Sequence, residues 1–264
     1  MTPAVEPPQG IPPATTEDAF LGGRLRILQP ARGYRAGLDA VLLASSVEPA
    51  NGNVLDCGAG VGTAGLCVAA RCSECRITLV EREPTLLDLA RQNIALNGFE
   101  GRVAGVSGDL LLPASHPGAP ALAAESFDCV LANPPYHDDD AGTRARDKLK
   151  DVSHAMGSGS LTDWLRFAAR MTKPAGRVTL INKAEALPCL LEAMKDRFGA
   201  LSVTPVHSYA ASPAIRVIVA GTKGSRAPLT LRPPVVLHEA GGAFTPYVGR
   251  ILREGAPLVL QPED

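Results

Sequence analysis

One segment limits the possible folds of this chain more than any other. In residues 53–63, Asn-Val-Leu-Asp-Cys-Gly-Ala-Gly-Val-Gly-Thr, an apolar run leads into three alternate glycines. The run predicts a buried strand, and the apolar residues after Thr63 predict a helix. Glycine lets the turn adopt conformations closed to other residues, and the helix start presents unpaired N–H groups. The segment therefore predicts a nucleotide-type binding loop in an α/β fold.

Hydrophobic periodicity extends this unit into an alternation of strands and helices. Such alternation builds a Rossmann-like, doubly wound sheet that is mostly parallel. The last two strands are separated only by residues 210–213, so we expect a hairpin and an antiparallel edge strand. The predicted strands lie near 25–29, 53–57, 76–81, 101–106, 127–132, 177–182, 201–209 and 214–222, and the predicted helices near 37–47, 63–72, 84–97, 161–172 and 184–197.

The chain length of 264 residues suits one α/β domain, which we expect to span residues 21–264. Residues 1–20 are expected to form a disordered tail, because the first 16 are rich in proline and lack the features of a signal peptide. We find no apolar run long enough to span a bilayer. We expect segment 233–253 to add a short strand and a helix.

The six cysteines lie mostly in apolar segments, which indicates reduced, buried thiols and a cytoplasmic location. Cys72 and Cys75 form a lone Cys-x-x-Cys pair with no second pair at zinc spacing. We therefore expect no metal site.

Acidic residues follow the predicted strands at positions where a cofactor could bind. Asp56 precedes the glycines, Glu81 ends the next strand and Asp109 follows the third. A carboxylate about 20 residues after a glycine loop commonly binds ribose hydroxyls. The pattern suits NAD or S-adenosylmethionine, and the Asp-x-Gly-x-Gly order favours S-adenosylmethionine.

The strand at 127–132 ends in Asn133-Pro134-Pro135-Tyr136. Successive prolines donate no N–H, so the carbonyls of Asn133 and Pro134 are left to accept hydrogen bonds. The Asn133 side chain adds another acceptor, and Tyr136 offers a stacking face. This turn is suited to hold a planar amino group, and a strand-terminating turn is the plainer alternative.

The residues after this turn include a basic run at 144–150. It predicts either a solvated charged loop or a lid that orders on phosphates. Net charge is −1, but a local basic face still permits RNA binding. Arg216, on the last strand, could extend that face.

Together these segments resemble the motifs of class I S-adenosylmethionine-dependent methyltransferases, and most closely the bacterial tRNA1(Val) adenine-N6 methyltransferases. The resemblance covers the chain from about Gly22 and is sharpest at 33–43, 213–217 and 224–228. Leu38 departs from it, because that family often has Thr there. The resemblance implies S-adenosylmethionine as cofactor and methyl transfer to the N6 amino group of an adenosine in tRNA, beside the anticodon of valine tRNA.

The resemblance also implies roles for individual residues. We expect cofactor binding by Tyr34, Asp39, Asp56, Gly58, Gly60, Glu81, Asp109 and Asn133. The expected catalytic residues are Asn133, Pro134 and Tyr136. Substrate binding is expected at Pro135, Tyr136, Arg144, Arg146, Lys148 and Arg216.

Two other functions stay open at this point. A glutamine-N5 methyltransferase of release factors also needs a planar amide NH2, although such enzymes usually have an additional helical N-terminal domain. A non-catalytic cofactor-binding adaptor is the other alternative, against which the intact acceptor turn argues. Oligomeric state cannot be derived from the sequence.

Overall fold

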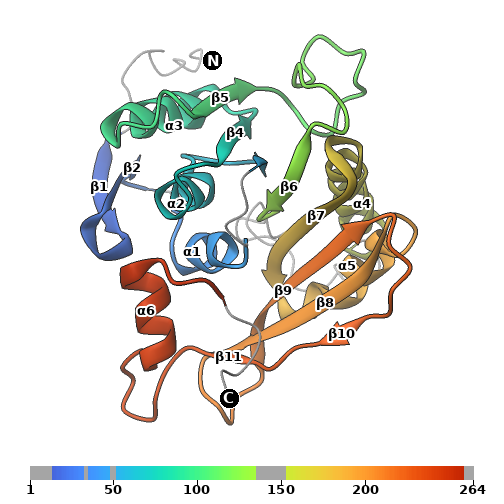
Figure 1. Ribbon diagram of the computed structural model, residues 1–264. Coiled ribbons are helices and arrows are strands. Elements are labelled where there is room, and N and C mark those ends of the chain that lie inside the picture. The colour runs from blue at the N-terminus through green and yellow to red at the C-terminus, as the bar shows by residue number, and fades with distance from the viewer. Residues whose placement is uncertain (1–13, 33–34, 48–51, 135–152, 259–264) are drawn as a thin grey trace, which may run out of the picture.

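The computed structural model describes residues 14–32, 35–47, 52–134 and 153–258, with the side chains of 153–160 excepted. Figure 1 shows a central twisted sheet with helices against both of its faces. The strands of this sheet are β3 (Asn53–Cys57), β4 (Arg76–Glu81), β5 (Val103–Ser107), β6 (Phe127–Ala132), β7 (Thr172–Lys183), β8 (Phe198–His207), β9 (Ala214–Lys223), β10 (Thr230–Leu231) and β11 (Val235–Val236). The helices are α1 (Leu38–Ser45), α2 (Thr63–Arg71), α3 (Pro84–Leu96), α4 (Ser153–Met171), α5 (Leu187–Met194) and α6 (Pro246–Glu254), with short 3-10 turns η1 (Leu21–Gly23) and η2 (Ala184–Ala186).

The strand order is β10-β8-β9-β7-β6-β3-β4-β5, and β11 also pairs with β8. Strands β5, β4, β3, β6 and β7 are mutually parallel, whereas β9 is antiparallel to both β7 and β8. This confirms the doubly wound sheet with an antiparallel strand near its edge. The chain runs outward from β3 to β5 and then returns to β6 on the other side of β3, so the topological switch point lies between β3 and β6.

The core has two halves, one on each face of the sheet, because successive strand residues point to opposite faces. Val54 belongs to the half that contains α1, α2 and α3, and its neighbour Leu55 to the half that contains α4 and α5. Leu79 and Val80 divide in the same way. The buried strands are therefore apolar on both faces, as parallel strands require.

The N-terminal region differs from the prediction. Residues 1–13 lie outside the described residues, but β1 (Thr15–Phe20) is an ordered strand that pairs antiparallel with β2 (Leu25–Pro30) in a separate two-stranded sheet. A disordered tail reaching residue 20 is thus wrong for Thr15–Phe20. Opposite charges lie across the hairpin, where Arg26 is 2.6 Å from Glu17.

The prediction of reduced cysteines also needs correction. Cys72 and Cys75 form a disulfide at the end of α2, where their Cα atoms are 5.5 Å apart, a separation typical of bonded cysteines. Cys57 and Cys67 are free and buried, whereas Cys189 is exposed. Burial raises the pKa of the Cys67 thiol to about 12, so this thiol is protonated at neutral pH.

No helix in the described ranges is long and apolar enough to cross a membrane.

Candidate active site

The predicted site residues meet at the carboxyl edge of the sheet. In the strand registers, Cys57 is opposite Val80 on one side and Ala132 on the other. The residues that follow these three, Gly58, Glu81 and Asn133, therefore form a row across neighbouring strands about 4.8 Å apart. The row brackets the topological switch point, which is where doubly wound sheets bind ligands.

The glycine loop uses the backbone freedom expected of it. Gly58, Gly60 and Gly62 have φ values of 63°, 57° and 88°, which side chains rarely tolerate. A Cβ atom at Gly58 would lie 2.3 Å from Cη2 of Trp164 on α4. The ring of Trp164 thus packs directly on the loop and leaves no room for a side chain at Gly58.

One polar atom beneath this loop has no hydrogen bond. Thr63, the first residue of α2, is 1% exposed, and its Oγ1 has no partner among the described residues. Buried hydroxyls usually have a partner, so an unsatisfied one beside a ligand loop suits a group supplied by a ligand.

Glu81 ties the end of β4 to the glycine loop. Its Oε2 accepts from Gly60 N at 2.8 Å, and its Oε1 accepts from the backbone N–H groups of Arg82 and Glu83, each at 2.9 Å. A carboxylate offers about four lone-pair sites. Three are used by the backbone, which leaves one site for a ribose hydroxyl.

Asp56 lies underneath the loop. It is 3% exposed, and its Oδ2 accepts from Gly65 N in α2 at 2.8 Å. Burial raises the pKa of Asp56, the hydrogen bond from Gly65 lowers it and the Glu81 carboxylate raises it, with a net value of about 7. The contact assigns Asp56 to positioning α2 beneath the loop, and direct cofactor binding stays a prediction.

Asp109 forms a local turn at the end of β5. Its Oδ1 accepts from Leu111 N at 2.9 Å, and its Oδ2 is 3.5 Å from a guanidinium nitrogen of Arg82. Glu81, Arg82 and Asp109 therefore bring alternating charges to the adjoining ends of β4 and β5.

Asp39 and Arg216 are brought together, although the sequence predicted different roles for them. Arg216 Nε donates to Asp39 Oδ2 at 2.9 Å, and about a quarter of each side chain is exposed. Asp39 lies in the first turn of α1 and Arg216 near the start of β9. The ion pair joins the segment expected over the cofactor to the strand expected to face the substrate.

The segment before α1 is held by the N-terminal hairpin. The buried Gln29 side chain accepts from Ala36 N at 2.7 Å and donates to Ala36 O at 3.3 Å. Arg35 donates to Thr16 Oγ1 at 2.7 Å and also pairs with Asp18. Strand β1, absent from the sequence prediction, thus supports the segment that leads to Asp39; Tyr34 lies outside the described residues.

A fully buried asparagine on α3 connects this hairpin to the glycine loop. Asn93 Oδ1 accepts from Leu28 N at 2.7 Å, while its Nδ2 donates to Leu28 O and Val61 O, each at 3.0 Å. Asn97, one turn later, makes the equivalent pair of bonds to Arg26 N and O, at 2.9 and 2.7 Å. Each of the two side-chain amides thus pairs with the backbone N–H and C=O of one β2 residue, as a neighbouring strand would.

The acceptor turn begins where it was predicted. Asn133 is half-buried and Pro134 is buried, directly after β6. Five of the other predicted substrate or catalytic residues lie outside the described residues: Pro135, Tyr136, Arg144, Arg146 and Lys148.

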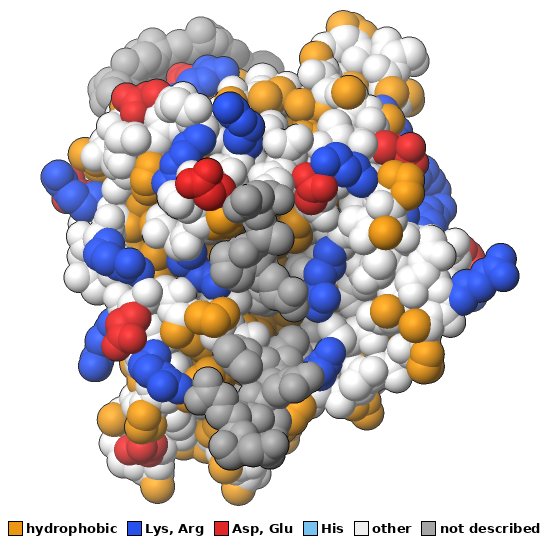
Figure 2. Space-filling view, viewed as in Figure 1, with side chains coloured by type: hydrophobic (Ala, Val, Ile, Leu, Met, Phe, Trp, Pro, Cys, Tyr) orange, Lys and Arg blue, Asp and Glu red, His pale blue; other side chains and the backbone are white. Residues whose placement is uncertain are grey.

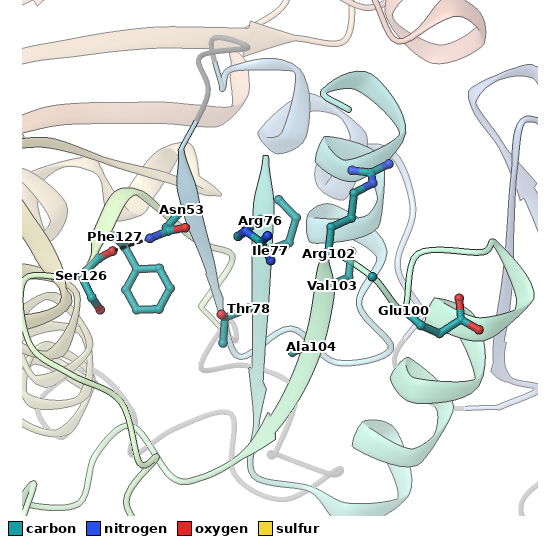
Figure 3. A pocket seen from close by; sticks show the side chains of 11 residues that line it. Asn53, Arg76, Ile77, Thr78, Glu100, Arg102, Val103, Ala104, Ser126 and Phe127 are labelled. Carbon is teal, nitrogen blue, oxygen red and sulfur yellow. Dashed lines mark hydrogen bonds between the residues drawn. The ribbon is translucent and has the colours of Figure 1, made fainter. Parts of the chain in front are cut away.

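The opposite edge of the sheet contains a shallow cavity of about 440 Å³ at the amino ends of β3 to β6. Figure 3 shows Arg102 directed towards α2 and Glu100 pointing outward. Arg102 donates to Ala69 O and Cys72 O, at 2.7 and 2.9 Å, where α2 ends. The polar groups do not converge, and this cavity is separate from the carboxyl-edge site.

Among the described residues, no group of three or more His, Cys, Asp or Glu side chains is placed to hold a metal ion.

Three residues of the site were not predicted from the sequence: Trp164, Thr63 and Asn93. Asn93 had a detectable signal, since it is a polar residue at an apolar position of α3 with a second asparagine one turn away. Trp164 and Thr63 had none, because their importance comes from contacts between elements.

Comparison with known proteins agrees with this geometry. The family described as methyltransferase small domain matches residues 37–159. A tRNA1(Val) (adenine(37)-N6)-methyltransferase of Porphyromonas gingivalis is 27% identical over 89% of this chain and 93% of its own. The enzyme of the same name from Aeromonas salmonicida is 29% identical over 80% of this chain and 85% of its own.

A solved structure from Agrobacterium tumefaciens, described as a predicted O-methyltransferase, is 33% identical and has a TM-score of 0.71. The match covers 83% of this chain and 97% of that protein. The sheet order, the glycine loop at the switch point and these matches lead to one conclusion: the chain belongs to the S-adenosylmethionine-dependent methyltransferases with the class I fold.

Proposed function

We propose that this chain transfers a methyl group from S-adenosylmethionine to the N6 amino group of an adenosine in tRNA, at the position beside the anticodon. The observation that carries the proposal is the register of β3 and β6, which puts the Asn133–Pro134 turn one strand from the glycine loop. An amino group held at this turn would lie beside the cofactor loop.

The cofactor fits the residues present. The three positive-φ glycines of the loop, the unsatisfied Thr63 hydroxyl and the carboxylates of Glu81 and Asp109 lie at one edge of the sheet. The glycine loop would hold the cofactor through its backbone, and the two carboxylates through hydroxyl and amino groups. When bound, S-adenosylmethionine supplies an electrophilic methyl group on a sulfonium.

The chain's own contribution to the reaction is positioning. The Asn133 side-chain oxygen and the Pro134 carbonyl would accept both N–H hydrogens of the adenine amino group, which makes its nitrogen more pyramidal and more nucleophilic. These acceptors also disperse the positive charge that develops on nitrogen. Holding nitrogen and methyl carbon in line would lower the barrier further. As the N–C bond formed, the S–C bond would break to leave S-adenosylhomocysteine, and the displaced N6 proton would pass to solvent. Tyr136 would stack on an adenine turned out of the anticodon loop, a contact worth about 1–3 kcal/mol.

The assignment to tRNA is supported by relatives that span nearly the whole chain and carry this activity in their names. Figure 2 shows Lys and Arg side chains at several places around the grey atoms at the centre of the face in view, so this face has cations to attract phosphates. The O-methyltransferase description of the solved relative is a second possibility for the acceptor atom.

The test is incubation of purified protein with methyl-labelled S-adenosylmethionine and unmodified total tRNA, in parallel with release factor. Nucleoside analysis should find the label in N6-methyladenosine. Label in a 2′-O-methylated nucleoside would transfer the assignment to oxygen, and label in release factor alone would make the chain a protein-glutamine methyltransferase. Cofactor binding without transfer to either would favour the adaptor.

Two variants separate binding from chemistry. Asn133→Ala should reduce turnover by about 10²-fold or more, as expected for a lost transition-state contact, with cofactor affinity unchanged. Tyr136→Ala should instead raise the KM for tRNA. An equal loss of cofactor affinity in Asn133→Ala would contradict its role as amino-group acceptor.

A further inference from the structure

Three aromatic rings meet at the end of β8, away from the acceptor turn. The rings of His238 and Phe244 stack with centroids 4.8 Å apart and 21° between their planes. Tyr209 packs on His238 at 5.6 Å with a 39° tilt. Tyr209 and Phe244 are nevertheless 44% and 42% exposed. Two partly exposed rings that pack on a third offer flat faces on which a planar group can stack.

The backbone around these rings is fixed by hydrogen bonds. His238 N donates to Ser208 O at 2.9 Å, and His238 pairs with Phe244 as an isolated β-bridge. Ser212 closes the tip of the β8–β9 hairpin on Tyr209, because its N–H and Oγ both bond to Tyr209 O, at 3.0 and 2.8 Å. The backbone that carries the two exposed rings is therefore held in place by local hydrogen bonds.

The cluster lies on the same edge of the sheet as the acceptor turn. Strand registers lead from Ala132 on β6 through Leu180 on β7 and Val219 on β9 to Val203 on β8, four residues before His207. Three strand spacings across the sheet and four residues along β8 together correspond to about 20 Å. A nucleic-acid strand with stacked bases advances about 3.4 Å per nucleotide, so the cluster is about six stacked nucleotides from a base held at Asn133.

Charge near the cluster is balanced. Segments 207–216 and 237–250 contain two arginines, Arg216 and Arg250, and one acid, Glu239. Arg216 is paired with Asp39. Attraction of phosphates is therefore weak here, and the rings offer mainly flat apolar faces.

From these observations we propose that Tyr209, His238 and Phe244 form a stacking platform for an unpaired base of the RNA substrate, a few nucleotides from the methylated adenosine. The proposal rests on the proposed function for its choice of RNA. Stacking on aromatic side chains tolerates any base, because each base has a π face. The platform would hold the flanking part of the loop while the target base is turned out.

Binding of an RNA hairpin with the target adenosine in its loop, measured by fluorescence anisotropy, tests the platform. Tyr209→Ala or Phe244→Ala should weaken binding about 5- to 150-fold, the range for one lost stacking contact. Tyr209→Phe should stay within about two-fold of the unmodified protein. Leu229→Ala is the matched control, since Leu229 is also 44% exposed but lies before β10, and it should have no effect. Circular dichroism melts verify folding, and Tyr209→Leu retains an apolar side chain should Tyr209→Ala unfold.

Two further measurements test whether stacking causes the loss of RNA affinity. In a set of hairpins, each lacks the base at one position near the target adenosine. For one of these hairpins, Tyr209→Ala should no longer weaken binding. The slope of log Kd against log salt should be unchanged in the platform variants, because no phosphate contact is lost. Unchanged affinity in the Tyr209→Ala/Phe244→Ala protein, an equal penalty on every abasic hairpin, or a reduced salt slope would overturn the platform.

The outcome is separable from that of the methylation assay. Transfer to tRNA by all platform variants with unaltered KM overturns the platform and leaves the proposed function intact. Ring-dependent RNA binding without any transfer supports the platform and rejects the function. Ring-dependent binding of release factor in place of RNA rejects both.

Discussion

Arg216 and Asp39, 177 residues apart in the sequence, form an ion pair that connects β9 to the start of α1. The sequence predicted one as a substrate contact and the other as a cofactor contact. The ion pair therefore links the position of the start of α1 to that of the start of β9. A change at either residue is expected to alter KM for both substrates.

A double-mutant cycle with Asp39→Asn and Arg216→Gln should give a coupling energy of about 1 kcal/mol in urea unfolding, since the pair is mostly shielded from water. The matched control is Arg26 with Glu17, whose side chains are 55% and 41% exposed. Coupling there should be closer to zero. Equal coupling energies for the two pairs would contradict a larger contribution of the Asp39–Arg216 pair to stability.

Asn93→Ala should lower the free energy of unfolding by about 3 kcal/mol or more, because Leu28 and Val61 lose partners in a buried place. The same change should raise the Kd for S-adenosylmethionine, since Val61 belongs to the glycine loop. Asn97→Ala is the comparison: it loses bonds to Arg26 near the surface, so its cost should be smaller and cofactor affinity should not change. Calorimetric titration and urea unfolding check both variants.

Gly58→Ala should abolish cofactor binding and destabilise the fold, because the added methyl group collides with Trp164 and the φ of 63° disfavours a side chain. Gly249→Ala, inside α6 with open space around it, should instead stabilise by about 0.5–1 kcal/mol. A Gly58→Ala protein with ordinary cofactor affinity would show that the ligand does not approach this loop.

Asp56 predicts a pH dependence of stability. Its pKa is about 7 in the fold, against an ordinary value of 3.8. Between these values the unfolded chain has released the proton that the folded chain retains, so stability falls as pH rises from about 4 to 7 and then levels off. A separation of about three in pKa corresponds to about 4 kcal/mol at most. The free energy of unfolding of Asp56→Asn, measured in urea across this pH range, should not fall in this way. If both proteins lose stability equally from about pH 4 to 7, Asp56 is not the cause.

Elements with strong apolar periodicity could be predicted from the sequence to within a few residues. β3, β4, β6 and β9 are examples, because two buried faces require nearly continuous apolar residues. β1 could not be predicted, because Thr15–Phe20 is largely polar and forms a strand through backbone pairing with β2. Helix α4 begins at Ser153, eight residues before the predicted start; the sequence did not indicate this extension, because Gly157 and Gly159 have low helix propensity.

The sequence predicted those site residues that are neighbours in the chain and directly follow a strand. The glycine loop and the Asn133–Pro134 turn follow directly from strands, so their place at one edge follows from parallel pairing. The partners of Glu81, Asp39 and Asn93 depend on contacts between distant segments, which residue types alone do not specify. The apolar residues around Cys57 correctly indicated a free thiol. They did not indicate the Cys72–Cys75 disulfide, because that bond depends on how the chain turns after α2.

Trp164 is the single tryptophan of the chain, and its ring rests on Gly58. Nearly all fluorescence excited at the red edge of protein absorbance therefore originates beside the cofactor loop. The protein contains its own optical probe of that loop: a change in emission on adding S-adenosylmethionine would report occupancy without a label, and the same signal would follow the loop as the protein unfolds.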